Sequence, residues 1–259
     1  MKILHIWNTA AVPQTLAKYQ RMLGHKTKVI YRKAFNPFGF EGSIRGSAKQ
    51  FYFRTILMSR KFDIIHVHAV DRIVPMLKRI YNRPILLTYH GTDIRGRWEE
   101  KEKYWKKADF VSVATPDLLE GAPPEAQYIV NPVDIEHFKR INNFIPDSVL
   151  FVSQNGLEWL LDIVRAETRK RDLRLTVQNR SMCIIPYSAY PRFLELYEYY
   201  IDIKECFGKI NPAMSLTAFQ FLALGGKVIY LGKEYEGLPE IYNPDRIAKL
   251  WIDIYDKYK

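Results

Sequence analysis

The sequence predicts an α/β protein built from two doubly wound, Rossmann-like domains that face each other across a cleft. Short apolar runs typical of buried parallel strands alternate with segments of helical period along the whole chain. A polar stretch at residues 135–147, which contains two adjacent asparagines and Pro146, interrupts this alternation and is the best candidate for a linker. We therefore expect an N-terminal domain at residues 1–134 and a C-terminal domain at residues 148–259, whose final helices can pack back on the first domain.

Each expected strand of the first domain is a short apolar run bounded by turn residues. These strands are expected at residues 2–7, 26–31, 64–67, 85–89, 109–114 and 127–130. Helices are expected at residues 14–23, 49–58, 70–80 and 99–107, and a mobile loop rich in glycine and phenylalanine at residues 35–47.

The second domain repeats the alternation after the linker. Its strands are expected at residues 149–152, 173–177, 183–185, 201–203 and 227–231. Helices are expected at residues 156–167, 190–199 and 215–224, with one or two closing helices from residue 239. Gly225 and Gly226 mark the end of the helix at 215–224, because glycine readily takes the left-handed conformation that closes a helix.

The composition indicates a soluble, folded protein. Of its 259 residues 47% are hydrophobic, which is enough for a sizeable core and excludes wholesale disorder. Cys183 and Cys206 give neither a disulfide framework nor a spaced set of metal ligands, so we expect both to be small buried residues in a reducing compartment. The N-terminal MKILHIW is typical of a core strand rather than of a signal peptide, and no apolar run approaches the roughly 20 residues of a membrane span. We expect a cytoplasmic location.

The net charge of +11 lies almost entirely in one half of the chain. Residues 1–134 carry 22 Lys and Arg against 12 Asp and Glu, whereas residues 135–259 carry 17 against 16. This asymmetry favours an anionic partner for the first half. No run of Lys and Arg interleaved with aromatic residues forms a specific nucleic-acid motif, so we expect no specific nucleic acid among the partners.

Polar side chains follow two neighbouring expected strands, at the point where each strand ends. They are His66, His68 and Asp71 after the first strand, and Tyr89, His90, Gly91, Thr92 and Asp93 after the second. Ligands of open α/β sheets bind just beyond the carboxyl ends of the strands, so we look for chemistry there. A neutral imidazole at His90, beside a glycine that lets a ligand come close, can hydrogen-bond a substrate hydroxyl group or a developing charge. The alternative is that His90 only caps a turn.

The histidines also raise the question of a metal site. His66 and His68 lie two residues apart on a strand and so share a face, with Asp71, His90 and Asp93 nearby. Histidine nitrogen and carboxylate oxygen are zinc ligands. Because no second acidic cluster is spaced to complete a shell, we expect no metal and interpret these residues as histidines hydrogen-bonded in or near the core.

Four segments of the chain together resemble one family, the family 4 (group 1) glycosyltransferases of the GT-B fold. In chain order they are HVHAVDRIVPMLKRIYNRPILLTYHGTDIR, ADFVSVATPDLL, YIVNPVDIEHF and SLTAFQFLALGGKVI. The resemblance runs over nearly the whole chain and is strongest at residues 63–138. It implies transfer of a sugar from a nucleotide-diphosphate donor, with retention of anomeric configuration and without a metal or another cofactor. It also implies that the N-terminal domain holds the acceptor and the C-terminal domain holds the donor.

The resemblance gives roles to the residues that match the family's motifs. His90 matches the histidine of a T-x-H-G segment beside the reacting sugar, which makes it the candidate catalytic residue. The N-G/P-V-D turn that starts the interdomain connection is matched by Asn131, Pro132, Val133 and Asp134. The candidate donor-binding residues are Ser215, Leu216, Thr217 and Gln220. The candidate substrate-binding residues are Thr9, Ala10, Ala11, His68, Asp71, Gly91, Thr92 and Asp93.

Three positions differ from the family pattern. Ala10 and Ala11 stand where the family has two glycines, and residues 153–156 lack the family's diphosphate-binding Arg and Lys. Gln220 replaces the ribose-binding glutamate, keeping the side-chain length and hydrogen-bonding groups but losing the charge; alternatively it is an exposed helix residue. These differences leave open a non-catalytic GT-B-like module that has lost donor binding, and the basic half leaves open a polyanion-binding protein.

The acceptor is expected to be a glycan or a lipid-linked molecule, because many members of the family glycosylate lipids. An anionic membrane surface attracts each nearby Lys or Arg by about 1 kcal/mol. We therefore expect peripheral membrane binding through Arg45, Lys49, Arg54, Arg60 and Lys61, beside a loop that carries Phe35, Phe38 and Phe40. Evenly solvated lysines on a basic protein are the alternative.

Overall fold

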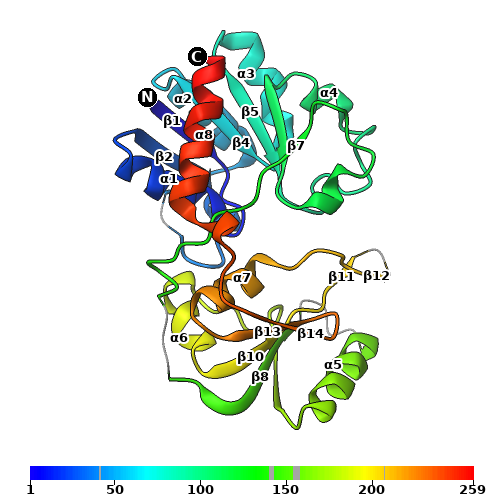
Figure 1. Cartoon of the computed structure of the whole chain (residues 1–259). Helices are drawn as coiled ribbons and strands as arrows, with labels where there is room; N and C mark the ends of the chain where they lie inside the picture. The colour runs from blue at the N-terminus through cyan, green and yellow to red at the C-terminus, as the bar shows by residue number, and fades with distance from the viewer. Residues whose placement is uncertain (41, 140–142, 154–157, 207) are drawn as a thin grey trace. The chain divides into compact units, whose positions relative to one another are not determined.

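The chain forms two compact units. The computed structural model describes residues 1–40, 42–139, 143–153, 158–206 and 208–259. Unit 1 consists of Met1–Asn36, Phe40–Pro132 and Ile241–Lys259, and unit 2 of Pro37–Gly39 and Val133–Glu240 (Figure 1). The chain thus leaves unit 1 within the predicted N-P-V-D turn, and its last helix returns to unit 1.

Unit 1 is built on a parallel sheet of seven strands. Their spatial order is β3-β2-β1-β4-β5-β6-β7, and every pairing is parallel. The strands are β1 (Lys2–Ile6), β2 (Lys26–Arg32), β3 (Ser43–Ile44), β4 (Ile64–His68), β5 (Ile85–Tyr89), β6 (Phe110–Val113) and β7 (Gln127–Tyr128). The direction of strand addition reverses between β1 and β4. In doubly wound sheets the carboxyl ends of the strands at such a reversal border the ligand site.

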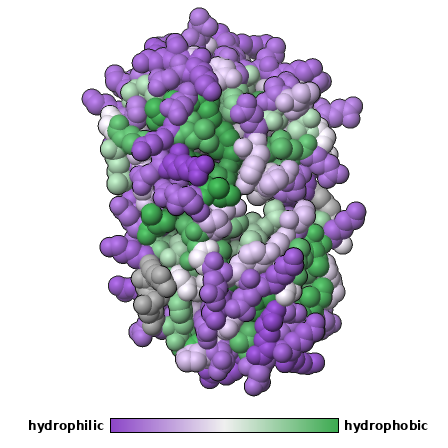
Figure 2. Space-filling view, viewed as in Figure 1, coloured by the Kyte–Doolittle hydropathy of each residue, from purple (hydrophilic) through white to green (hydrophobic). Residues whose placement is uncertain are grey.

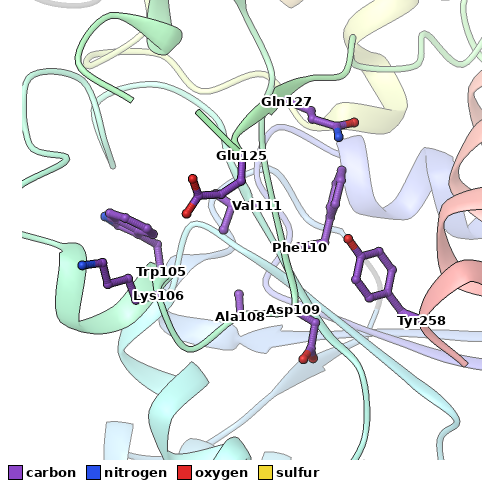
Figure 3. Close-up of a pocket in the computed structure, with 9 residues that line it drawn as sticks. All are labelled: Trp105, Lys106, Ala108, Asp109, Phe110, Val111, Glu125, Gln127 and Tyr258. Carbon is purple, nitrogen blue, oxygen red and sulfur yellow. The ribbon is translucent and has the colours of Figure 1, made fainter. Parts of the chain in front are cut away.

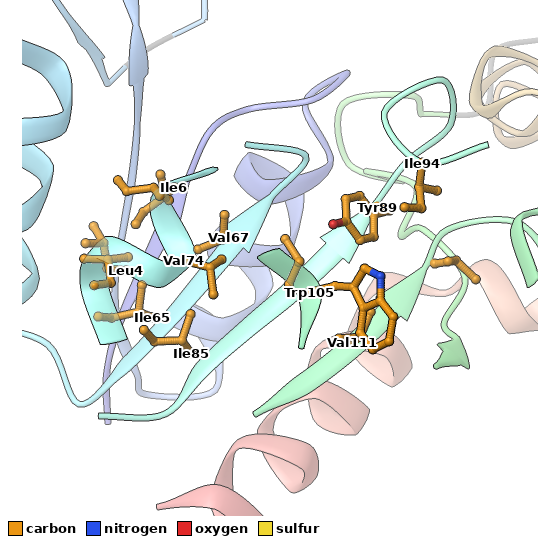
Figure 4. Packing of buried hydrophobic residues seen from close by; sticks show 14 of the residues in the cluster. Leu4, Ile6, Ile65, Val67, Val74, Ile85, Tyr89, Ile94, Trp105 and Val111 are labelled. Carbon is orange, nitrogen blue, oxygen red and sulfur yellow. The ribbon is translucent and has the colours of Figure 1, made fainter. Parts of the chain in front are cut away.

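Helices cover both faces of this sheet because both faces of its central strands are apolar. One face packs against α1 (Val12–Met22) and α8 (Pro244–Tyr258), which contribute residues such as Leu16 and Trp251. The other face packs against α2 (Ala48–Ser59), α3 (Val74–Ile80) and α4 (Glu102–Trp105), in the cluster of Figure 4. Short 3-10 turns of unit 1 lie at Lys33–Phe35, Asp71–Ile73 and Pro116–Leu119, and a further one at Glu240–Tyr242 spans the boundary between the units. The expected loop at residues 35–47 therefore contains the short strand β3.

Unit 2 has a smaller sheet with the order β14-β13-β10-β8-β9, in which only β14 is antiparallel. The strands are β8 (Ile145–Ser153), β9 (Arg174–Asn179), β10 (Tyr197–Ile201), β13 (Lys227–Tyr230) and β14 (Lys233–Glu236), and β11 (Glu205–Cys206) and β12 (Lys209–Ile210) form a separate pair. The helices are α5 (Glu158–Lys170), α6 (Tyr190–Leu194) and α7 (Leu216–Ala223), with a 3-10 turn at Tyr187–Ala189. The strand order reverses between β8 and β10, so these two strands mark the corresponding position in unit 2.

Several expectations for unit 2 were wrong. The helix expected at residues 190–199 ends at Leu194, because the aromatic segment after it pairs as β10 with both β8 and β13. Residues 183–185 form no strand, and Cys183 is exposed while Cys206 is half-buried, so neither cysteine is a core residue. The segment expected as a linker, residues 135–147, includes the start of β8, and its residues 140–142 lie outside the described residues. The end of α7 follows the expectation: Gly225 has φ 90°, and a Cβ on Gly226 would lie 2.2 Å from the Phe221 ring.

The face shown in Figure 2 mixes polar and apolar residues. Among the described residues, no helix has the length and hydropathy needed to cross a membrane.

The turn between β1 and α1 has an uncommon backbone. Ala10 has φ 50° and Ala11 has φ 64°, in the left-handed region where a Cβ atom costs roughly 1–2 kcal/mol per residue. These two alanines replace the glycine pair of the family that the sequence resembles, and glycine takes this conformation without that cost. The turn thus adopts a glycine-type backbone although the glycines are absent.

This strain predicts a stabilising substitution. Ala10 is exposed, so Ala10→Gly removes the steric cost without loss of packing. Glycine has a larger entropy in the unfolded chain, which offsets part of this gain. The net effect should be a rise of about 0.5–1 kcal/mol in the free energy of unfolding. Ala166→Gly is the control, because Ala166 is also exposed but lies in the interior of helix α5, where glycine should lower stability. Denaturant titration of both variants measures the difference, and a loss of stability in Ala10→Gly would contradict the strain argument.

Candidate functional site

The predicted polar residues of unit 1 gather at the carboxyl ends of β1, β4 and β5. These strands are neighbours in the sheet, with His5 in register with His66 and His68 in register with Thr88. Asn8 and Thr9 follow β1, Asp71 follows β4, and His90 follows β5. The expected strand-end cluster therefore forms at the reversal point of the sheet.

His90 is half-buried, and both its ring and its backbone N–H have hydrogen-bond partners. Its ring Nε2 lies 3.1 Å from Nδ1 of His68. Its backbone N–H donates to the Asp93 carboxylate at 2.9 Å, and the Gly91 N–H donates to the same carboxylate at 2.6 Å. Asp93 therefore shapes the turn after β5 through its own carboxylate. Thr92, at the tip of this turn, is exposed.

The space next to His90 is open at Gly91. A Cβ placed on Gly91 would meet no atom within 4 Å, and its φ is not in the left-handed region. Neither backbone conformation nor packing therefore requires glycine at this position. This leaves close approach of a ligand as a physical reason for the glycine.

His68 and Asp71 lie behind the surface that a ligand would reach. His68 is 1% exposed, and its ring lies between those of His5 and His90. Asp71 is 2% exposed and accepts from Lys101 Nζ at 2.7 Å and from the Tyr89 hydroxyl at 2.9 Å. Both were predicted to bind substrate directly. Their side chains are buried and hydrogen-bond neighbouring residues, and direct binding of substrate by them stays a prediction.

A buried polar layer connects His90 to the interior of unit 1. We define it as His5, Gln20, His66, His68, Thr88, Ser112 and Tyr255, all fully or almost fully buried. Alternation along the strands explains it, because residues two apart on a strand share a face. His5, His66, Thr88 and Ser112 thus lie on the face that α1 and α8 cover, and those helices supply Gln20 and Tyr255.

Hydrogen bonds link the members of this layer. His5 contacts Gln20 Oε1 at 2.9 Å and His68 Nε2 at 3.1 Å. His66 contacts the Tyr255 hydroxyl and the Thr88 hydroxyl, each at 2.7 Å, and Thr88 contacts the Ser112 hydroxyl at 2.7 Å. Sequence reasoning identified His66 and His68 as sharing a face, but it gave no role to His5, Gln20 or Tyr255.

His5, His66 and His68 also have nitrogen atoms within 4.8 Å of one another, the spacing of a metal-binding group. Asp71 and Asp93, which the metal hypothesis included, are not part of this group. Each of the six ring nitrogens already has a hydrogen-bond partner. The geometry is that of core histidines paired with one another and with hydroxyl and amide groups.

Burial controls the protonation of these rings. It lowers the pKa of His5 to about 4, and burial together with neighbouring histidines lowers the pKa of His66 and of His68 well below the ordinary value. Burial also lowers the pKa of His90, against smaller opposite effects of Asp93 and the Asn131 side chain. The four rings are therefore neutral at pH 7.

Buried polar atoms without hydrogen-bond partners in the described part of the chain occur at the same strand ends. They include Asn8 Oδ1, Thr9 Oγ1 and His90 Nδ1. Such atoms are rare in folded proteins and call for an explanation. The predicted turn of Thr9, Ala10 and Ala11 lies beside them, at the N-terminus of α1, where backbone N–H groups favour an anion.

In unit 2 the predicted donor-binding residues lie at the start of α7. Ser215 caps this helix: its hydroxyl accepts from the Ala218 N–H at 3.2 Å and donates to Asp202 at 2.7 Å. The Ser215 N–H donates to the same carboxylate at 2.6 Å. Thr217 and Gln220 are 6% and 7% exposed, so Gln220 is not an exposed helix residue. Leu216, the first residue of α7, is half-buried.

Sequence reasoning missed two cations at the carboxyl ends of the unit 2 strands. Arg180 follows β9 and Lys204 follows β10. Burial lowers the pKa of Lys204, and the positive charge of Arg180 lowers it further, against the raising effect of Asp202. The segment that corresponds to the family's diphosphate-binding Arg and Lys, residues 153–156, has neither residue type, and its positions 154–156 lie outside the described residues. The available signal was a basic residue directly after β9 and another three residues after the end of β10.

A pocket of about 240 Å³ lies elsewhere, at the amino-terminal ends of β6 and β7 (Figure 3). It is lined by Trp105, Lys106, Ala108, Asp109, Phe110, Val111, Glu125, Gln127 and Tyr258. Asp109 is already paired with Lys78 at 2.6 Å. In a parallel sheet this edge is opposite to the strand ends that carry His90.

Comparisons with known proteins support a single family. Residues 9–137 match the model of Glycosyltransferase Family 4. A search of curated proteins found no match. Among solved structures, an alpha-glucosyltransferase in complex with UDP and a 13-mer DNA containing a central A:G mismatch is 11% identical, with 89% of this chain and 79% of that chain covered and a TM-score of 0.62.

Two further solved structures cover more of the chain. Sucrose-phosphate synthase from Thermosynechococcus elongatus is 13% identical over 99% of this chain and 90% of that chain, with a TM-score of 0.57. Spinosyn rhamnosyltransferase complexed with thymidine diphosphate is 11% identical over 100% of this chain and 90% of that chain, with a TM-score of 0.51. These similarities confirm the expected fold class.

The buried histidines predict acid-sensitive stability. A histidine with a lowered pKa in the folded state binds fewer protons there than in the unfolded state, so its stabilisation is complete above about pH 6.5 and is lost as the pH falls toward 4. Each such histidine should contribute up to about 1.4 kcal/mol per pH unit to the slope of unfolding free energy against pH in this window.

Denaturant titrations at pH 4.5–7.5 measure this slope. His66→Gln should reduce it, whereas Ser112→Ala, which alters the same layer without removing a titrating group, should lower stability equally at all pH values. Identical slopes in the wild type and His66→Gln would show that His66 does not titrate on unfolding.

Proposed function

We propose that this protein transfers a sugar from a nucleotide-diphosphate donor to a hydroxyl group of an acceptor. The premise is that residues 9–137 belong to glycosyltransferase family 4 and that the chain has the GT-B fold. The observation that carries the proposal is His90, which lies at the carboxyl end of β5 beside the open position Gly91 within the matched segment. In such a reaction the protein mainly positions two substrates and stabilises the charge of the leaving diphosphate.

Unit 1 would hold the acceptor and the reacting sugar. His90 would contact a hydroxyl group of the reacting sugar, while the strand-end atoms of Asn8 and Thr9 and the N-terminus of α1 would interact with polar groups nearby. Retention of configuration and independence from metal are further parts of the proposal, which come from the family resemblance.

Unit 2 would hold the donor. Gln220, buried on α7, would hydrogen-bond the ribose in place of the family's glutamate. Arg180 and Lys204 would balance the diphosphate charge, which removes the need for a metal ion in this role. Nucleotides in the solved structures with this fold, UDP and thymidine diphosphate, support a nucleotide-sugar donor.

The donor proposal predicts nucleotide-dependent stability. UDP, GDP, ADP or TDP should raise the melting temperature in a concentration-dependent way, because a ligand that binds only the folded state stabilises it. Arg180→Gln and Lys204→Gln should each weaken binding by about tenfold or more, since a hydrogen bond to a charged group contributes roughly 1.5–3 kcal/mol. Gln220→Ala should weaken it by a factor of a few, and Gln220→Glu should keep or strengthen it.

Isothermal titration in buffer with EDTA measures these affinities, with Lys170→Gln as the control because the Lys170 side chain is 72% exposed on α5. A donor-hydrolysis screen then tests His90→Ala, which should lower turnover more than donor affinity. Absence of binding for all four nucleotides would overturn the donor site and favour the non-catalytic module.

We also propose that unit 1 binds an anionic membrane surface through helix α2. Its exposed side combines Phe53, at 63% exposure, and Leu57, at 44%, with basic residues at exposed positions. These basic residues are Lys49, Arg54, Arg60 and Lys61. Phe53 and Leu57 are four residues apart and so share a helix face. Basic residues beside exposed apolar side chains are typical of helices that lie in a membrane interface.

The apolar contribution differs from the sequence expectation. Phe40 is buried and Phe38 is half-buried, so neither provides a free apolar surface, while Phe35 is 57% exposed. Phe40 is only 9% exposed, and a hydrogen bond from Asn36 Nδ2 to its backbone carbonyl at 2.7 Å fixes this segment. Helix α2 therefore replaces the 38–40 segment in the proposed surface.

Vesicle co-sedimentation tests this surface. The protein should bind vesicles with anionic lipid but not neutral ones, and high salt should abolish binding because screening shortens to about 3 Å at 1 M. Leu57→Ser combined with Phe53→Ser should reduce the bound fraction several-fold. Leu250→Ser is the matched control, since Leu250 is also 44% exposed but lies on α8. Equal recovery in the supernatant with both vesicle types would exclude the membrane proposal, and salt-sensitive binding of any DNA instead would favour the polyanion alternative.

A further inference from the structure

Gln20 lies at the junction of two chains of hydrogen bonds in the buried polar layer. Its Oε1 is 2.9 Å from His5 Nε2, and its Nε2 is 3.3 Å from the Tyr255 hydroxyl. An amide oxygen only accepts a hydrogen bond and an amide nitrogen only donates one. Gln20 is 0% exposed, so water does not compete for these positions. Its amide therefore sets which partner donates in both chains.

The first chain runs from Gln20 toward His90. Because Gln20 Oε1 accepts, His5 carries its proton on Nε2, and the neutral ring accepts at Nδ1. His68 must then donate from Nε2 to His5 and accept at Nδ1. That Nδ1 lies 3.1 Å from His90 Nε2, so His90 donates from Nε2. A neutral His90 is left with an unprotonated Nδ1.

The second chain runs from Gln20 toward the far side of the sheet. Gln20 Nε2 donates to the Tyr255 hydroxyl, which then donates to His66 Nδ1 at 2.7 Å. His66 donates from Nε2 to the Thr88 hydroxyl, and Thr88 donates to Ser112. The two chains share only Gln20. A change at Tyr255 therefore interrupts the second chain without altering the order of donors in the first.

We propose that Gln20 is a positioning residue that fixes the tautomer of His90 through His5 and His68, so that His90 offers an unprotonated Nδ1 as a hydrogen-bond acceptor at the carboxyl end of β5. Nδ1 is a buried ring atom that makes no well-formed hydrogen bond to a described residue, and the Asn131 side chain, which raises the pKa of His90 against the effect of burial, lies near the ring. The tautomer therefore decides whether Nδ1 accepts or donates a hydrogen bond when a polar group approaches it. An unprotonated Nδ1 accepts from a hydroxyl group. If the proposed function holds, that hydroxyl belongs to the reacting sugar or to the acceptor.

The opposite arrangement gives a clear contrast. With the Gln20 amide reversed, every donor in the first chain becomes an acceptor, and His90 carries its proton on Nδ1. His90 would then donate to a ligand instead of accepting from it.

Nitrogen-15 NMR of the histidine-labelled full chain at pH 7.5 tests it. Protonated and unprotonated ring nitrogens have well-separated shifts, and the His90→Gln spectrum identifies the His90 signals. The wild type should show His90 protonated at Nε2 and unprotonated at Nδ1. A proton on His90 Nδ1 in the wild type would overturn the proposal, whether or not any variant folds.

Two variants then test the role of Gln20. Gln20→Met keeps the side-chain volume but replaces the amide acceptor for His5 Nε2–H with a weakly accepting sulfur, so the preference for the Nε2–H tautomer of His90 should weaken and the Nδ1–H tautomer should become populated. Tyr255→Phe makes a comparable change at a fully buried position but leaves the first chain intact, so His90 should keep its wild-type tautomer. Equal His90 spectra in both variants, or the same shift in both, would show that Gln20 does not set the tautomer.

The readout does not depend on catalysis. If the tautomers behave as described but no nucleotide-sugar is consumed, the proposed function fails while the role of Gln20 stands. If sugar transfer is found, Gln20→Met should lower kcat by about tenfold or more with little change in KM for the donor, and Tyr255→Phe should change kcat much less.

Discussion

Unit 1 depends on a layer of polar side chains sealed between its parallel sheet and the two helices that cover one face. Burying these groups without partners would cost several kcal/mol each, whereas a complete set of hydrogen bonds makes their burial tolerable. The set is complete only when Gln20 of α1 and Tyr255 of α8 both meet the histidines of β1 and β4. The positions of the two helices on the sheet, and of the rings beneath His90, thus follow from one requirement.

Much of the fold could be predicted from the sequence because its strands obey simple patterns. The apolar runs of β1, β4 and β5 gave those strands, and the helical spacing of Val74 and Leu77 gave α3. The prediction failed at β10, because the helix expected at residues 190–199 ends at Leu194 and Tyr197–Ile201 pairs with two neighbouring strands. Pairing partners distant in sequence decide such a segment, and local periodicity does not contain them.

The position of the candidate site could be predicted from the sequence, but the contacts of several of its residues could not. The position of His90 followed from the rule that ligands bind at the carboxyl ends of parallel strands. The burial of His68 and Asp71 could not be predicted, because it depends on His5 and on Lys101, which come from other parts of the chain. Arg180 and Lys204 were missed for a different reason. Each is a single basic residue without a motif, and only the sheet of unit 2 brings the two strand ends to one edge.

The return of the chain to unit 1 also affects how the protein can fold during synthesis. Residues 133–240 form unit 2, so they are translated between the two parts of unit 1. Residues 1–132 leave the ribosome with one sheet face covered by α1 alone until Trp251 and Tyr255 of α8 arrive. Exposed apolar surface of this kind attracts chaperones and proteases. Unit 2 can complete its core first. A ribosome that stalls before residue 251 would release a chain in which α8 does not cover the sheet of unit 1.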